Sequence, residues 1–291
     1  MTFSPPLPAL LPKPEGVGLA LGAGGARGLA HIVVLEALDE LGVKPVAIAG
    51  SSMGAVIGAA YAAGVTGKQL RAHALGLLRN RANFMTQLLR ARVGRFSDLL
   101  SGLGANPVLI DGEKLLDLVW PAQVPDRFEQ LAIPLTAVAT DFHGRRDALF
   151  ETGPLAPAVA GSMAIAGLVK PVSADGMYLV DGGVTNPLPY RALIGRAAVI
   201  VACDVTMGPI GLEAASPRPF EAMFGAAQIL QGAITREMLK TDAPDILLIP
   251  KVQTFRTLDF FRAVKILEAA EHLREEVKRA LGERLESLNR A

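Results

Sequence analysis

Short apolar runs alternate along the chain with stretches of helical periodicity. The runs predict strands at Val17–Leu21, Val46–Ala49, Leu135–Ala139, Ala148–Phe150, Tyr178–Val180, Val199–Ala202 and Ile246–Ile249. Helical patterns lie between several of them, from about Arg27 to Leu41 and from Ala55 to Ala63, and one long amphipathic helix is predicted from Phe260 to Leu288. Strands that alternate with helices in this way form a mostly parallel sheet covered on both faces, so we expect an α/β fold.

Composition fits one globular unit in a reducing compartment. The 291 residues are 51% hydrophobic and 20% charged, which is enough for a large buried core. We expect a flexible segment at residues 1–14, which does not resemble a signal peptide, and one domain at residues 15–291. The single cysteine, Cys203, excludes an internal disulfide and suits a cytoplasmic protein. A net charge of +1 argues against a nucleic-acid binder.

Two uncharged stretches, Pro45–Gly67 and Thr152–Val169, have about the length of a membrane span. The first contains a strand-like run followed by an alanine- and glycine-rich helical pattern, and the second is interrupted by prolines and glycines. We therefore interpret both as buried core of the α/β domain.

The segment from about 68 to 110 differs in composition from the rest of the chain. It contains seven basic residues against one acid, Asp98, together with many leucines. We predict a basic helical insertion here. It is either an ordinary pair of solvated surface helices, or a lid or peripheral membrane contact in which arginines meet lipid phosphates and apolar side chains meet acyl chains.

The segment Gly50–Gly54, GSSMG, matches the pattern G-x-S-x-G. This pattern places a nucleophilic serine on a sharp turn between a strand and a helix, and such elements are predicted on either side of it. A frame centred on Ser51 fails, because Ala49 and Met53 would occupy its glycine positions. Ser52 is therefore the candidate nucleophile, and the alternative is an ordinary helix-capping serine.

A glycine-rich loop, Gly22–Gly28 with the sequence GAGGARG, follows the first strand. The N–H groups of such a loop bind anions. A dinucleotide fingerprint is not matched, because Arg27 stands at its last glycine position and no acid follows the second strand. An acyl-transfer enzyme would instead use these donors for a developing oxyanion. A nucleotide-binding regulatory module remains an alternative hypothesis.

The base that would activate Ser52 is either a histidine or an aspartate. The four histidines, His31, His73, His143 and His272, stand in contexts typical of surface or capping residues, although the positions of His143 and His272 permit a triad. Three aspartates follow apolar runs, where open parallel sheets bind ligands: Asp141, Asp181 and Asp204. Asp181 stands out because Gly182 and Gly183 let the chain turn sharply after it. An aspartate serves as the base only if burial raises its pKa from its ordinary value of about 3.9.

Taken in order, GAGGARG, GSSMG and the DGG that begins at Asp181 resemble the motifs of the patatin-like phospholipase family, in particular its small single-domain bacterial members. The surrounding sequences LALGAGGARGLAHIVVLEAL, IAGSSMGAVIGAAYAAG and YLVDGGVTNPLP match as well. The likeness runs from about residue 16 to the C-terminus, and the segment 68–110 is its least typical part.

This resemblance implies a three-layer α/β/α sandwich with a mostly parallel central sheet and a Ser-Asp dyad rather than a triad. Ser52 would be the nucleophile and Asp181 the base, while Arg27 would orient the glycine loop or meet an anionic substrate. The loop residues that would hold the oxyanion are Gly24, Gly25 and Ala26. The implied activity is hydrolysis of fatty-acyl esters of phospholipids or lysophospholipids, without a metal, nucleotide or other cofactor.

Two segments depart from the family pattern. In Gly161–Gly167, Ala166 stands where the family usually has proline, and this departure leaves Ser162 without an assigned role. The turn His143–Arg146 replaces a more acidic one and favours anionic headgroups. A second hypothesis for the chemistry is acyl transfer to an acceptor other than water, since transfer and hydrolysis use the same acyl-enzyme.

Overall fold

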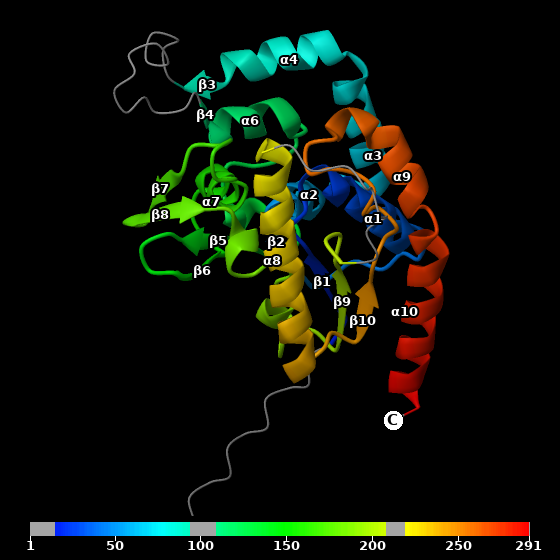
Figure 1. Ribbon diagram of the computed structural model, residues 1–291. Coiled ribbons are helices and arrows are strands. Elements are labelled where there is room, and N and C mark those ends of the chain that lie inside the picture. The colour runs from blue at the N-terminus through cyan, green and yellow to red at the C-terminus, as the bar shows by residue number, and fades with distance from the viewer. Residues whose placement is uncertain (1–14, 94–108, 208–218, 291) are drawn as a thin grey trace, which may run out of the picture.

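The computed structural model describes residues 15–93, 109–207 and 219–290, so the predicted flexible segment 1–14 lies outside the described residues. An eight-stranded sheet forms its centre (Figure 1), in the order β10-β9-β1-β2-β5-β8-β7 with β6 also paired to β5. The strands are β1 Val17–Leu21, β2 Ala47–Ser51, β5 Leu135–Asp141, β6 Arg146–Phe150, β7 Val172–Ala174, β8 Met177–Val180, β9 Val199–Cys203 and β10 Ile246–Leu248. β10, β9, β1, β2 and β5 run parallel, which confirms the predicted sheet.

Helices connect most of these strands. The α-helices are α1 His31–Glu40, α2 Met53–Ala62, α3 Gly67–Arg79, α4 Arg81–Arg90, α6 Gly112–Val119, α7 Leu155–Ser162, α8 Pro219–Thr241, α9 Ala263–Ala270 and α10 Leu273–Asn289. Short 3-10 helices are η1 Gly25–Ala30, η2 Phe128–Gln130, η3 Gly182–Val184, η4 Tyr190–Leu193 and η5 Phe260–Arg262. A small second sheet pairs β3 Arg92–Val93 with β4 Leu109–Ile110.

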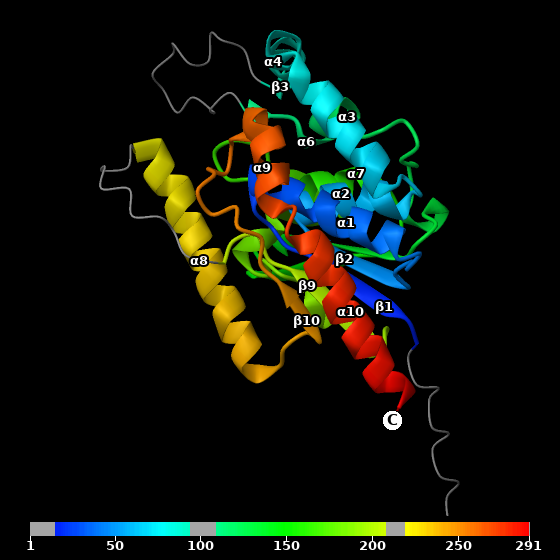
Figure 2. The ribbon, with the colours of Figure 1, turned by 90° about the vertical axis from the view of Figure 1, so that its right-hand side faces the viewer.

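The alternation of side chains along β1 explains why the sheet has a layer of helices on each face. Leu19 and Leu21 point into the larger core, which α1, α2, α7, α9 and α10 cover, whereas Ala20 points into a smaller core under η4 and α8. Figure 2 shows α8 on one side of the sheet and α1, α9 and α10 on the other. The C-terminal half of α8 contacts the sheet, because Met238 and Leu239 there pack on the smaller core. The three-layer α/β/α architecture is thus confirmed.

Both uncharged stretches of the sequence belong to this core. Residues 45–67 contain β2 and α2, and residues 152–169 contain α7, whose side chains are largely buried between the sheet and α6. Within the described part of the chain, no helix is both long and apolar enough to cross a membrane.

The basic segment is helical at α3 and α4, and α4 lies at the top of the molecule in Figure 1. Leu70 and Phe84 anchor the two helices because they are buried, whereas Met85 and Leu89 on α4 are exposed. Arg71 does not face solvent freely, since it is bound to acidic side chains of the core helices. Asp98 lies outside the described residues.

The predicted single helix from Phe260 to Leu288 was wrong, because η5, α9 and α10 occupy this region and the chain breaks at Glu271 and His272. The break lets α9 pack on η1 while α10 packs along α1 and β10. His272 lies close to the carbonyl of Ala269, with 3.0 Å between its Nδ1 and that oxygen. The predicted helix from Arg27 likewise begins as the 3-10 helix η1 and becomes α-helical only at His31.

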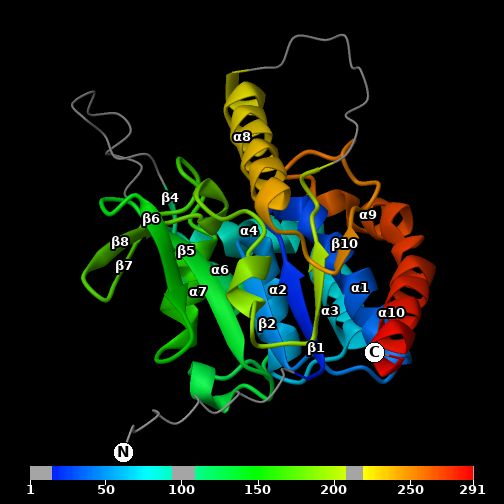
Figure 3. The same ribbon diagram turned by 90° about the horizontal axis from the view of Figure 1, so that it is seen from below.

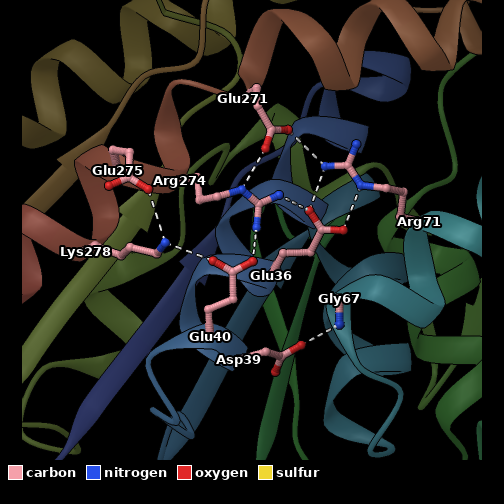
Figure 4. Close-up of polar contacts among 9 residues, drawn as sticks. All are labelled: Glu36, Asp39, Glu40, Gly67, Arg71, Glu271, Arg274, Glu275 and Lys278. Atoms are coloured by element: carbon pink, nitrogen blue, oxygen red, sulfur yellow. Dashed lines mark hydrogen bonds and ion pairs between the residues drawn. The ribbon is translucent and has the colours of Figure 1, made fainter.

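A network of ion pairs joins α1, α3 and α10 (Figure 4). Glu36 on α1 is buried, and its two oxygens accept hydrogen bonds of 2.7 and 2.6 Å from Arg71 and one of 2.7 Å from Arg274. Glu271 also binds both arginines. The hydrogen bond with Glu36 is the main cause that raises the pKa of Arg71. Because α1 directly follows the glycine loop and η1, this network fixes the helix on which that loop is mounted (Figure 3 shows the same helices from below).

Replacing Glu36 with glutamine should lower the free energy of unfolding by about 2–3 kcal/mol, because two arginines then face a buried neutral amide. The matched control is Glu275→Gln, since this carboxylate also binds a cation, Lys278, but is 80% exposed. Its loss should stay below about 0.5 kcal/mol. Urea unfolding at pH 7 measures both variants, and equal losses would show that the buried network does not hold these helices.

Candidate active site

Two strands approach each other from opposite directions along one edge of β5. β2 runs parallel to β5, and its last residue, Ser51, pairs with Val138. β8 runs antiparallel, and its last residue, Val180, pairs with Thr140. Because β6 pairs with β5 over Ala137–Asp141 and so overlaps both, β2 and β8 share the opposite edge. The residues that follow the two strands, Ser52 and Asp181, are therefore brought together by the topology.

Ser52 lies between β2 and α2 in a strained backbone conformation, with φ 53° and ψ −121°. Its Oγ donates a 2.6 Å hydrogen bond to Oδ2 of Asp181. Its side chain makes no capping hydrogen bond to α2, so it does not behave as an ordinary N-cap. At Gly54 a Cβ would overlap the carbonyl oxygen of Leu21, so only glycine lets α2 begin this close to β1. The strand, the sharp turn and the helix expected for G-x-S-x-G are all present.

Asp181 is buried, with 5% of its surface exposed, and both carboxylate oxygens are engaged. Oδ2 accepts the Ser52 hydroxyl, and Oδ1 accepts the N–H of Gly183 at 2.8 Å. Burial raises the pKa of Asp181 to about 6, and the hydrogen bonds from Ser52 and Gly183 act in the opposite direction. The backbone of Asp181 is held by Thr140, whose hydroxyl donates to the backbone carbonyl oxygen of Asp181 at 3.0 Å. The pKa of Asp181 is therefore raised by burial, as is required of an aspartate that serves as the base.

The glycine loop follows β1 and is tied to its surroundings at several N–H groups. Gly22 donates to the carbonyl of Cys203 at 3.0 Å, and Ala26 donates to the carbonyl of Thr257 at 2.7 Å. Within the described ranges no acceptor is found for the N–H of Gly24 or Gly25. Gly25 has φ +58°, and a Cβ there would overlap Thr257, so this turn requires glycine. Among the residues that the structure describes, Gly24 and Gly25 thus retain N–H donors without an acceptor, whereas the N–H of Ala26 already has one.

Arg27 lies at the end of this loop and is 3% exposed, so it is not a surface arginine. Its Nε and one terminal nitrogen, Nη2, have no hydrogen-bond partner among the described residues. Burial lowers the pKa of Arg27 to about 10, and the charge of Asp204 acts in the opposite direction. Arg27 is therefore a buried cation held near Asp204.

Residues 19–194 match the model of the patatin-like phospholipase family, and this range is more than half of the 291 residues. The chain belongs to the patatin-like phospholipase family. The family suggested by the three sequence motifs is thereby confirmed.

Relatives of this patatin-like chain include larger proteins. An uncharacterised NTE family protein of Mycobacterium tuberculosis is 43% identical over 180 residues, which cover 62% of this chain and 46% of that protein. Lysophospholipase NTE1 of Mycosarcoma maydis is 30% identical over 261 residues, which cover 89% of this chain and 13% of that protein. The chain therefore spans less than half the length of these relatives. Among solved structures, VipD from Legionella pneumophila is 15% identical with a TM-score of 0.47, covering 91% of this chain and 67% of that one.

The motif glycines of the patatin-like chain lie where neighbouring elements come close. A Cβ at any of them would come within 3.1 Å of another residue. These glycines are Gly22, Gly28, Gly50, Gly54, Gly182 and Gly183. The three motifs therefore meet in one tightly packed region, at the carboxyl ends of β1, β2 and β8.

Among the described residues, no histidine makes a hydrogen bond with the Ser52 hydroxyl. His31 is buried, not a surface or capping residue, and its Nε2 is 2.9 Å from the carbonyl oxygen of Gly22 at the start of the glycine loop. Burial lowers the pKa of His31 to about 4, so the ring is neutral at pH 7 and Nε2 carries the proton that this carbonyl accepts. His73 lies near the carbonyl of Val119, and His143 stacks edge-on with Phe142 and Tyr178. The observed partner of Ser52 is Asp181, which disfavours a histidine triad.

The other two candidate aspartates stabilise turns. Asp141 lies 3.7 Å from Arg146, across the turn that was predicted to favour anions. Asp204 accepts hydrogen bonds from the N–H groups of Thr206 and Met207. No cluster of three or more histidine, cysteine, aspartate or glutamate side chains able to hold a metal ion is found in the described part of the chain. Cys203 is buried in β9, as expected of a core residue.

Sequence reasoning left Ser162 without a role, yet it contacts the turn at Ser52. Its hydroxyl accepts the N–H of Ser52 at 2.9 Å. No local pattern signals this contact, because Ser162 is the last residue of α7 and lies 110 positions from Ser52 in the sequence. The neighbouring Ala166, where the family usually has proline, does not prevent it.

The raised pKa of Asp181 predicts a specific pH dependence of stability. The folded state binds this proton more tightly than the unfolded chain, so the protonated carboxyl stabilises the fold at low pH, and this stabilisation is lost as the pH rises to about 6. Asp181→Asn removes the titration. The variant should gain roughly 2–3 kcal/mol relative to wild type between pH 4 and pH 8.

Urea unfolding of both proteins across this range measures the gain. His31 and the other titrating groups are present in both proteins, so their contributions cancel in the difference. A difference between variant and wild type that stays constant from pH 4 to pH 8 would show that the pKa of Asp181 is not raised.

Proposed function

We propose that this patatin-like protein is a serine acyl-hydrolase that cleaves fatty-acyl esters of phospholipids or lysophospholipids. The observation that carries the proposal is the 2.6 Å hydrogen bond from Ser52 Oγ to the buried carboxylate of Asp181. The family match and the lysophospholipase among the relatives support a lipid ester as the substrate class.

In the first half of the proposed reaction, Ser52 Oγ attacks the acyl carbonyl carbon while its proton passes to Oδ2 of Asp181. The tetrahedral intermediate then collapses, the ester C–O bond breaks, and the leaving alcohol takes the proton from Asp181. In the second half, water attacks the acyl-enzyme and gives its proton to Asp181. Ser52 leaves with that proton, and the fatty acid is released. No cofactor is needed for these steps.

The electrostatic environment of Asp181 suits a general base. A pKa of about 6 leaves the carboxylate mostly ionised at pH 7, yet far more basic than an ordinary aspartate. The hydroxyl proton already points at Oδ2 before substrate binds. In the proposed reaction Ser52 therefore needs no histidine, because the desolvated carboxylate of Asp181 accepts and returns the proton in both halves.

The developing oxyanion would be stabilised by the N–H groups of Gly24 and Gly25, which lack acceptors within the described structure. Ala26 would contribute only if its hydrogen bond to Thr257 opened. The proposed oxyanion site therefore has two N–H donors, those of Gly24 and Gly25, instead of the three that the family resemblance implied. Arg27 would stabilise the loop as a buried cation near Asp204, and it would not meet a substrate in solvent.

Ser52→Ala should abolish hydrolysis of a medium-chain aryl ester, and Asp181→Asn should lower the rate by at least about 10³-fold, since each removes a partner of the attack. The matched control is His272→Ala, which removes the histidine of the rival triad and should leave the rate within about twofold. Initial rates at pH 8 measure all three. Full activity of Ser52→Ala, or loss of activity in His272→Ala with Asp181→Asn unaffected, would refute the dyad.

Two alternatives remain distinguishable. Acyl transfer would yield acylated acceptor in place of fatty acid when a lysolipid competes with water, because the same acyl-enzyme is attacked by another hydroxyl. A nucleotide-binding module would bind nucleotide and leave Ser52 unlabelled by a fluorophosphonate. Neither alternative has an observation of its own in its favour.

We also propose that α4 makes a peripheral contact with membranes. Met85 and Leu89 lie one turn apart on its exposed surface, and the exposed Arg90 lies beside them. An apolar strip beside a cation suits an anionic lipid surface. The contact would keep the protein at the interface where its proposed substrate lies.

The double variant Met85→Ser/Leu89→Ser should bind phosphatidylglycerol vesicles at least about fivefold more weakly than wild type, because the apolar strip no longer enters the lipid. Ile194→Ser is the control, since Ile194 is exposed outside the insertion. Vesicle sedimentation at low and high salt measures both. Binding that is equally strong on neutral phosphatidylcholine vesicles at every salt concentration would remove the electrostatic part of the proposal.

A further inference from the structure

The hydroxyl of Ser162 lies between two backbone groups of the sheet. It accepts the N–H of Ser52 at 2.9 Å and donates to the carbonyl oxygen of Val138 at 2.5 Å. Ser162 has no exposed surface. A buried hydroxyl that donates one hydrogen bond and accepts another in this way has a fixed orientation.

The register of β2 and β5 shows what this hydroxyl replaces. Ile48 pairs with Leu135, and its N–H donates to the carbonyl of Pro134. In a parallel ladder such bonds recur at every second residue of the strand. Continued for four residues, the same register would join the N–H of Ser52 directly to the carbonyl of Val138. The Ser162 hydroxyl lies between these two groups and bridges them, so it replaces the direct backbone hydrogen bond that would come next in the ladder.

We propose that Ser162 is a positioning residue, which separates Ser52 from β5 and holds the strained turn from which the nucleophile points at Asp181. This inference rests on the proposed function, because it takes Ser52 as the nucleophile. Without the hydroxyl, the N–H of Ser52 loses its acceptor and the carbonyl of Val138 loses its donor, so the turn is no longer held at this distance from β5. Ser52 Oγ then shifts from its 2.6 Å position at Asp181.

A matched control lies next to the nucleophile. Ser51 is also fully buried, but its Oγ has no hydrogen-bond partner among the described residues. Ser51→Ala therefore removes a buried hydroxyl from the same turn without removing a link to the backbone. A general loss of packing would affect both variants alike, whereas loss of positioning would affect only Ser162→Ala.

The rate of Ser52 phosphonylation by a fluorophosphonate, measured beside ester hydrolysis, tests the inference. Ser162→Ala should lower the phosphonylation rate constant and kcat by about 10–100-fold with little change in KM, since a small displacement of a nucleophile has effects of this size. Ser51→Ala should remain within about twofold of wild type. The number of sites labelled at completion counts folded enzyme, so a lower rate constant is separated from a lower folded fraction. Ser162→Thr keeps the hydroxyl and should recover part of the rate.

Hydrogen exchange at the Ser52 amide gives a readout that does not need turnover. Its exchange should be at least about tenfold faster in Ser162→Ala than in Ser51→Ala, because the acceptor has been removed. The inference would be overturned if the fluorophosphonate labelled Ser52 at equal rates in wild type and in Ser162→Ala. It would also be overturned if exchange at the Ser52 amide in Ser162→Ala were no faster than in Ser51→Ala. Absence of labelling in wild type would instead refute the proposed function, and the exchange data would still decide the role of Ser162.

Discussion

The contact between Ser52 and Asp181 depends on a constraint of sheet topology. Two strands of opposite direction end against the same edge of β5, and the residues that follow them must occupy the gap between the strand ends. Strand pairing over a long sequence separation thus places both groups within 2.6 Å, and no flexible loop is needed to bring them together.

Burial of this pair has opposite effects on folding and on the proposed chemistry. A desolvated carboxylate destabilises the folded state above its raised pKa, and the strained backbone of Ser52 adds to that burden. The surrounding packing offsets both effects, through the large core on one face of the sheet and the ion pairs that clamp α1 to α3 and α10. In the proposed reaction, the same desolvation would make Asp181 a stronger base towards the serine hydroxyl. Stability and activity therefore place conflicting demands on one side chain.

Much of this architecture could be predicted from the sequence, because apolar runs mark buried strands directly. The sharp turn at Ser52 was predictable since glycines flank this serine in a fixed pattern. The turn after Asp181 was predictable since two glycines follow this aspartate. Other features depend on tertiary contacts that no local pattern encodes. The break before α10, the neutral buried state of His31 and the bond from Ala26 to Thr257 each arise from packing between distant segments. Ser162 belongs to this group, because its partner lies 110 positions away.

The pH dependence of Ser52 phosphonylation tests the central claim most directly, because it reads the protonation state of the group that activates this hydroxyl. The account predicts that the rate rises through a single ionisation with a midpoint near 6, the pKa of Asp181, and that this ionisation disappears in Asp181→Asn. A midpoint near that of an ordinary aspartate, about 4, would contradict it. So would a midpoint near 6 that persists in Asp181→Asn, since another group would then be the base.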